Sequence, residues 1–273
     1  MLRMETENGW WLITHPDHAR LAGAFARAWG NQRFRQHEPR SHVLRAIACH
    51  DDGWRERDAS PKVTREGLPS AFSLELVGSY SAFEEIDLAE YLAVRARAVR
   101  IVAADDPYAG LLIAIHTSNL LSEHVDRARM TSEQRSQLDD FLLGERNFQQ
   151  QLLKQIHDDL SLTMSEKHDT VIQENFRLLQ ACDNLSLLTC VAFDKPSDLL
   201  HSLPLLDGSS TPVQVFPLGP RHFRLTPWPF DRPELRFEFP ARHVIGRCFS
   251  TSEKLAEAFH AAPVEMLSVH LQV

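Results

Sequence analysis

The sequence predicts a mainly α protein, in which a helical bundle is followed by a small C-terminal antiparallel β (α+β) subdomain. Apolar residues recur at helical spacing in several long segments before residue 195. After Pro196 the pattern changes, because prolines and glycines separate short runs rich in β-branched and aromatic residues. We therefore expect a helical domain at 1–195 and a β-rich subdomain at 196–273 that packs on it.

The composition is that of an ordinary globular protein. Hydrophobic residues make up 43% and charged residues 24% of 273 residues, which is enough chain for a large core. The net charge of -8 and the lack of a long basic run argue against nucleic acid as a partner. Four widely spaced cysteines without a CxxC motif favour a reducing compartment, and no run of about 18 apolar residues predicts a membrane span. We expect a cytoplasmic protein that binds neither nucleic acid nor a membrane.

The helices have recognisable starts and stops. Residues 9–14 (GWWLIT) predict a short strand or an extended entry segment. Pro16 then suits the first turn of a helix whose apolar residues follow at helical spacing as far as Gly30. Further helices are predicted at about 40–51, 82–104, 107–124, 132–158, 168–191 and 252–260. Short strands are predicted at 213–218, 222–230, 234–239 and 264–273.

The most informative local motif is the pair His50 and Asp51, which ends an apolar helix inside AIACHDDGW. Adjacent residues on a helix point about 100° apart, so both can reach one ion only beside the helix terminus, where the backbone can adjust. An imidazole nitrogen and a carboxylate oxygen suit Fe, Mn, Zn, Co or Ni, and Mg would fit if carboxylate and water ligands dominate. The pair therefore indicates one divalent metal ion.

Three further residues could complete the site. His18 lies in the first predicted helix, and His116 ends the apolar run LLIAIH, where its ring must find a hydrogen-bond partner or an ion. Asp183 is surrounded by leucines, so an inward orientation would bury a carboxylate that needs a partner. The alternative is that each histidine, one of 14 in the chain, is an ordinary surface or hydrogen-bonded residue. The predicted metal ligands are His18, His50, Asp51, His116 and Asp183.

The order of an early His, a His-Asp pair and a distant Asp resembles the HD-domain superfamily of metal-dependent phosphohydrolases. The resemblance implies an HD-domain-like bundle and metal ligation by His18, His50, Asp51 and Asp183. The wider pattern is similar to an uncharacterised bacterial family with HD-like features, domain-of-unknown-function family 3891. The segments that carry this similarity are HPDHARLAGAFARAWG, AIACHDDGW, DPYAGLLIAIH, ACDNLSLLTC and PWPF.

One departure from the superfamily pattern affects the expected number of ions. HD proteins with two metals, including di-iron oxygenases, commonly have extra histidines between the His-Asp pair and the final Asp. This chain has none between Asp51 and His116, and His124 could supply a second only if its helix bends inward. We therefore expect a single-metal site.

Residues next to the His-Asp pair are candidates for catalysis. Asp52 could orient a ligand or act as a base on bound water, and Trp54 could shape the pocket, although an Asp-Gly turn capped by a core Trp explains both equally well. Arg55 and Arg57 could face a substrate anion, although a solvated loop also suits them. Residues 55–80 form a polar loop that we expect to act as a lid.

These features predict a metal-dependent hydrolase that acts on a small, anionic phosphate ester or phosphoanhydride. Asp52 and His116 are the predicted catalytic residues, with His116 as a further ligand or as a stabiliser of the phosphate. Two alternatives remain open: an iron-dependent oxygenase on the same scaffold, and a non-catalytic helical module that binds a ligand or partner. The sequence also allows a homodimer. Glycine-rich phosphate loops and GxSxG elbows do not occur, so neither a nucleotide cofactor nor serine-hydrolase chemistry is expected.

Overall fold

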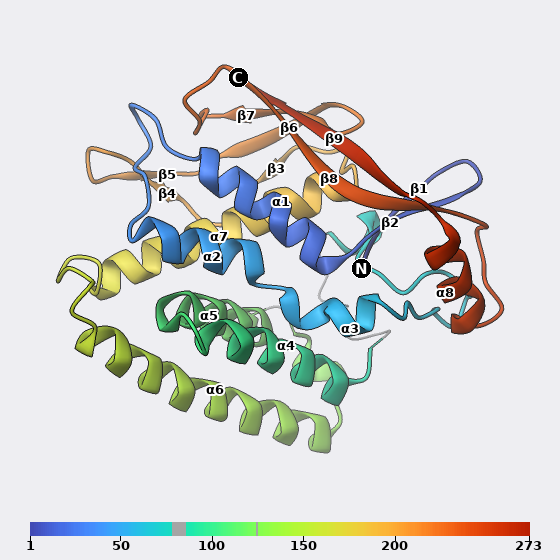
Figure 1. Cartoon of the computed structure of the whole chain (residues 1–273), viewed down its shortest axis with the longest axis horizontal. Coiled ribbons are helices and arrows are strands. Elements are labelled where there is room, and N and C mark those ends of the chain that lie inside the picture. The colour runs from blue at the N-terminus through green and yellow to red at the C-terminus, as the bar shows by residue number, and fades with distance from the viewer. Residues whose placement is uncertain (78–85, 124) are drawn as a thin grey trace.

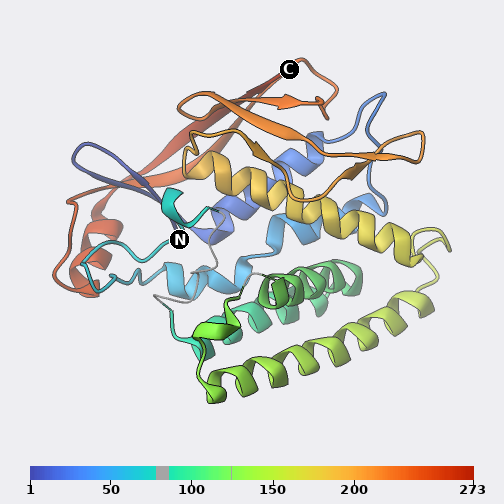
Figure 2. The same cartoon turned by 180° about the vertical axis from the view of Figure 1, so that it is seen from behind.

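The computed structural model of the chain describes residues 1–77, 86–123 and 125–273. Helix accounts for 49% and strand for 20% of it, which makes the protein α+β. Figure 1 shows two layers of helices beneath a curled sheet, with α1 and α7 between the sheet and the outer helices α4, α5 and α6. Figure 2 shows the same layers from behind. In the described residues, no helix is both long enough and apolar enough to cross a bilayer.

The helices lie close to their predicted positions. Thr14 caps α1 by accepting a hydrogen bond from the Asp17 N–H, and Pro16 stands in the first turn. The predicted helix at 82–104 begins only at Leu88, and its residues 82–85 lie outside the described residues. The helices are α1 His15–Ala28, α2 Arg40–Cys49, α3 Arg55–Asp58, α4 Leu88–Ala103, α5 Pro107–Glu123, α6 Ser132–Asp158, α7 Asp169–Cys190 and α8 Ser252–Ala261.

The sheet is larger than predicted. It has seven strands in the order β1-β2-β8-β9-β7-β6-β3, and β7 pairs with β9 in parallel. A separate two-stranded sheet pairs β4 with β5. The strands are β1 Leu2–Glu5, β2 Gly9–Ile13, β3 Ser197–Asp198, β4 Leu203–Pro204, β5 Ser210–Thr211, β6 Gln214–Gly219, β7 His222–Thr226, β8 Glu234–Ile245 and β9 Val264–Gln272.

The prediction of a mainly α fold with a small antiparallel β subdomain was therefore wrong. The N-terminal hairpin of β1 and β2 joins the C-terminal strands because β2 pairs with β8, with Trp10 opposite Val244. A Cβ at Gly9 would collide with the Val244 carbonyl, so glycine is required for this close pairing. The sheet thus takes strands from both sides of the predicted boundary at residue 195, and that boundary stays a prediction.

The main hydrophobic core lies between the sheet and the helices. It includes the inner faces of α1, α2, α5 and α7 together with residues of β6, β7, β8 and β9. Residues 108–114 of α5 are all buried, as expected for a central helix. Because these helices are held on several sides, the polar residues that they carry into the core have fixed positions.

Candidate metal centre

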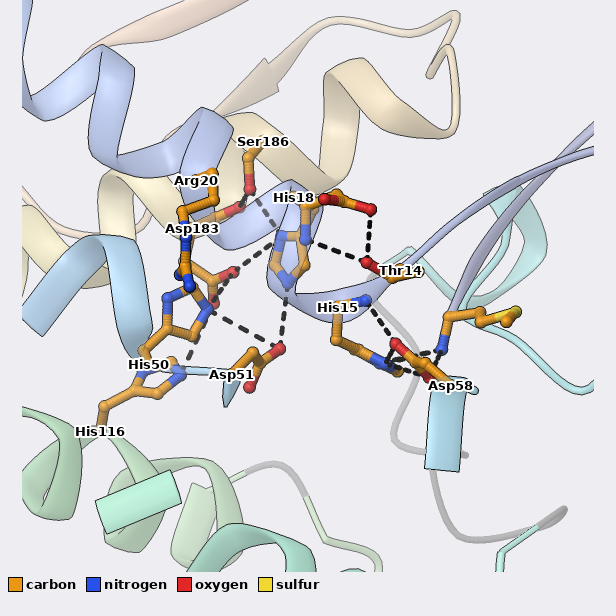
Figure 3. A network of polar contacts seen from close by, with 12 residues as sticks. Thr14, His15, His18, Arg20, His50, Asp51, Asp58, His116, Asp183 and Ser186 are labelled. Atoms are coloured by element: carbon orange, nitrogen blue, oxygen red, sulfur yellow. Dashed lines mark hydrogen bonds and ion pairs between the residues drawn. The ribbon is translucent and has the colours of Figure 1, made fainter. Parts of the chain in front are cut away.

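Four helices bring the predicted ligands together inside the protein. They come from the first turn of α1, the C-terminal end of α2, the middle of α5 and the second half of α7. Each of these residues lies in the core and is at most 8% exposed. Figure 3 shows them facing one another. The cluster consists of His18, His50, Asp51, His116 and Asp183, and we call it the His/Asp cluster.

The protonation of His18 follows from its partner Ser186. The Ser186 hydroxyl donates to the Asp183 carbonyl oxygen at 2.8 Å, so its oxygen is left to accept from His18 Nδ1, also at 2.8 Å. Nδ1 therefore carries the proton in the neutral ring. His18 Nε2, 3.0 Å from Asp51 Oδ2, then directs a lone pair at a carboxylate unless the ring is charged.

His50 repeats this arrangement. Its Nδ1 donates to the Ile47 carbonyl at 2.8 Å. Its Nε2 lies 3.2 Å from Asp183 Oδ1 and 3.8 Å from Asp51 Oδ2, but without hydrogen-bond geometry to any described residue. Burial disfavours a charged ring, but Asp51 and Asp183 outweigh burial and raise the pKa of His50 to about 9. The two carboxylates thus attract positive charge to Nε2, either as a proton or as a metal ion.

His116 has no hydrogen-bond partner for either ring nitrogen among the described residues. Its Nε2 lies 3.6 Å from Asp183 Oδ2, and its ring stands edge-on to that of His50 with centroids 5.4 Å apart. Burial lowers the pKa of His116 to about 3, so the ring is neutral at pH 7. A buried polar atom without a partner costs about 1–3 kcal/mol, and an ion bound at Nε2 would remove that cost.

Both carboxylates of the cluster are ionised. Burial alone would raise the pKa of Asp51, but Arg95 and His50 hold it well below its usual range. Burial likewise opposes the charge on Asp183, and His50 outweighs it to lower the pKa to about 2. Two anionic and up to three imidazole ligands form a donor set suited to a divalent ion of the Fe, Mn, Zn, Co or Ni type.

The ligand atoms fall into two groups that share His50. One is His18, His50 and Asp51, and the other is His50, His116 and Asp183, with the atoms of each group within 4.8 Å of one another. Since Nδ1 of His50 is committed to Ile47, only Nε2 can bind an ion, and it can bind one ion at a time. This favours the predicted single ion over a pair.

The comparison with known protein families agrees with the similarity seen in the sequence. The model of the protein family of unknown function DUF3891 matches residues 1–245. The chain belongs to this family. No curated protein and no solved structure gives a significant match. The HD-like relationship stays a prediction.

Arg95 lies beside the His/Asp cluster and was not predicted from the sequence. It comes from α4, 9% exposed, and its Nη1 donates to Asp51 Oδ1 at 2.6 Å. A Cβ at Gly53 would collide with the backbone of α4, so this glycine lets α4 approach closely enough to deliver Arg95. Its signal in the sequence is an arginine within the apolar stripe of a helix, between Tyr91 and Val99.

Asp52 and Arg55 lie apart from the His/Asp cluster in the DUF3891 protein. Asp52 accepts from Arg20 Nη2 with both carboxylate oxygens, at 2.9 and 3.1 Å. Arg55 is largely exposed and also contacts Asp52. No hydrogen bond or ion pair between described residues joins either side chain to the cluster, so a catalytic role for Asp52 stays a prediction. His124 lies outside the described residues.

Beside the cluster lies a cavity of about 190 Å³. Trp54 forms part of its wall and stacks on His15, another wall residue, with ring centroids 4.1 Å apart. Segment 70–76 of the predicted lid forms another part of the wall, whereas residues 78–80 lie outside the described residues. The guanidinium-bearing residues of the wall are Arg3, Arg57 and Arg95.

Proposed function

We propose that this DUF3891 protein is a hydrolase that uses one divalent metal ion to cleave a small phosphate ester or phosphoanhydride. His18, His50, Asp51 and Asp183 would hold the ion, and His116 would be a further ligand or would stabilise the phosphate. The observation that carries the proposal is the direction of the ring nitrogens: Nδ1 of two histidines is fixed as a donor, and each Nε2 faces a carboxylate. Outer hydrogen bonds that fix ligand histidines in this way are typical of metal sites.

A bound divalent ion would lower the pKa of a water molecule and polarise a phosphoryl oxygen. Other residues of the chain would hold the metal ligands in the required tautomer and orientation. Ser186 and the Ile47 carbonyl hold two rings in the tautomer that presents Nε2. Arg95 balances the charge of Asp51 and fixes its orientation. Asp52 could still orient water, but Arg20 already engages both of its oxygens.

The cavity beside the cluster supports an anionic substrate. Arg95 lines the cavity and donates to Asp51 of the cluster, so an anion in the cavity would lie close to the ion. Arg3 Nε and Trp54 Nε1 are buried donors without a partner among the described residues, and both residues line the cavity. Arginine guanidinium groups suit phosphate better than most neutral ligands. The walls also contain Tyr91 and Phe72, so a substrate with an apolar group next to its phosphate would fit.

The same donor set also suits Fe(II), so an oxygenase is the alternative reaction, and a non-catalytic binding module would need no ion. We also propose a cytoplasmic location, because all four cysteines are free thiols in the structure.

The test is phosphate release from a panel of phosphate monoesters and phosphoanhydrides by protein loaded separately with Mn, Fe, Zn, Co, Ni or Mg. We expect release that is lost in His50→Ala and retained in His157→Ala, which removes an exposed histidine of α6. Metal-loaded protein that releases no phosphate from any compound would contradict hydrolysis. Oxygen uptake by the iron form alone would favour the oxygenase.

A further inference from the structure

A large groove lies at the other end of α1 from the His/Asp cluster. Its volume is about 1190 Å³, and it is lined by the C-terminal end of α1, the segment 29–36, the start of α2 and residues 230–237. Arg27 and His18 are separated by about 14 Å along the helix axis at ~1.5 Å per residue. The groove and the metal centre are therefore separate places on the molecule.

The groove is basic although the chain as a whole is acidic. Five arginines from four segments line it, against one acidic lining residue, Asp231, in a chain with a net charge of -8. A concave surface lined by one sign of charge concentrates its field and attracts ions of the opposite sign. The arginines are Arg27, Arg33, Arg35, Arg40 and Arg232.

Most of these guanidinium groups are available to a ligand. Arg35 pairs with Glu174 at 3.0 Å, and Arg40 Nη2 donates to the Arg27 carbonyl at 2.7 Å. Arg40 Nη1 is buried and has no partner among the described residues. The remaining three, Arg27, Arg33 and Arg232, form no side-chain hydrogen bond or ion pair within the described part of the chain. An arginine whose donors are unused next to a groove is suited to bind an external acceptor.

The backbone that carries the arginines is held in place before any ligand binds. Asn31 Nδ2 donates to the carbonyls of Trp228 and Phe230, and Asn31 Oδ1 accepts from the N–H groups of Arg33 and Phe34. Phe34 is fully buried in this loop, whereas Arg33 is exposed and Arg35 is partly exposed. A fixed set of donors loses little entropy when it binds.

The chemistry of the wall indicates the kind of anion. Of the four aromatic lining residues, Trp29, Phe34 and Phe230 are at most 2% exposed, and the partly buried Phe237 packs edge-on against Phe25, so the wall offers little surface on which nucleobases could stack. Guanidinium groups bind phosphate through two parallel hydrogen bonds, and the three without an internal partner already exceed what one phosphate needs. We propose that this groove, which we call the arginine groove, binds a small anion that carries two or more phosphate groups.

The experiment is isothermal titration of the full-length protein with inorganic tripolyphosphate at low salt. We expect saturable binding that weakens about tenfold or more in the double variant Arg33→Gln/Arg232→Gln, which removes two exposed donors without an internal partner. The matched control Arg65→Gln/Arg146→Gln removes the same charge from exposed positions outside the groove and should bind as the parent does.

The His50→Ala variant separates this inference from the proposed function. Binding to the arginine groove should persist in it, because the groove does not use the metal centre. Binding that disappears in His50→Ala, equal weakening in the control double variant, or no saturable binding by the parent would each overturn the assignment.

Discussion

Two histidine and aspartate groups lie side by side in this protein and differ in how completely their polar atoms are paired. In the His15–Asp58 pair, Asp58 accepts from the His15 backbone N–H at 2.5 Å, approaches the His15 ring at 3.0 Å and accepts from the Met1 ammonium at 2.9 Å. In the His/Asp cluster, His116 has no hydrogen bond among the described residues, and His50 Nε2 has only poorly aligned carboxylates. Figure 3 shows both groups.

The difference teaches that residue type and burial do not by themselves mark a metal site. The two groups contain the same residue types and lie next to each other, since the rings of His15 and His18 have centroids 6.1 Å apart. What separates them is the number of unused lone pairs. A saturated pair contributes to stability, whereas an unsaturated group is suited to bind a cation.

The largest expected effect concerns the saturated pair. Asp58→Ala should lower the free energy of unfolding by about 3–5 kcal/mol, because it leaves buried donors without their acceptor. Metal content should stay at the parental level in the protein that folds. Urea denaturation and elemental analysis measure the two quantities, and a proportional fall in bound metal would place Asp58 within the metal site.

Acid should lower the stability of the fold through the largely buried ring of His15. Burial, opposed by Asp58, lowers the pKa of His15 to about 4, so the folded ring stays neutral while the unfolded ring binds a proton below about 6.5. The unfolded state then holds more protons between these values, and stability falls as the pH drops from 6.5 to 4. The full contribution is about 3 kcal/mol at 1.36 kcal/mol per pKa unit.

Denaturation at several pH values in parent and His15→Gln measures this contribution. The variant should lose the greater part of the acid-dependent slope. If the slope is unchanged, other groups cause it and the comparison loses this support.

A smaller effect, on metal affinity, is expected when the ion pair between Arg95 and Asp51 is removed. Arg95→Gln removes the cation that holds Asp51, so the affinity for metal should fall about 10–100-fold, the usual result of losing an outer partner of a ligand. Arg97→Gln on the same helix removes an exposed arginine paired with Glu56 and serves as the control. Equal metal affinity in parent and Arg95→Gln would show that Arg95 contributes to folding but not to metal binding.

Local patterns were sufficient to predict the helices and the five residues of the His/Asp cluster, but not how the strands pair in the sheet. The positions of α1 and α7 depend on caps and apolar spacing within a few residues. The pairing of β2 with β8 joins residues more than 200 positions apart. A short apolar run such as GWWLI does not indicate which strand it pairs with.

Within the site, the same distinction holds. The order of His18, His50, Asp51, His116 and Asp183 was visible because each stands in or beside an apolar helix. Arg95 was missed because its role depends on the packing of α4 against the turn at Gly53. Asp52 follows Asp51 directly, yet in the 3-10 turn Asp52–Trp54 its side chain faces Arg20. Sequence adjacency therefore does not predict which of two neighbouring carboxylates enters a site.

The measurement that tests the central claim most directly is elemental analysis of protein purified without chelators or an affinity metal, beside His50→Ala, Asp183→Ala and the control His157→Ala. The account predicts about one equivalent of Fe, Mn, Zn, Co or Ni in the parent and the control, and a sharp loss in both cluster variants. A parent protein that binds no divalent metal even after reconstitution would contradict it.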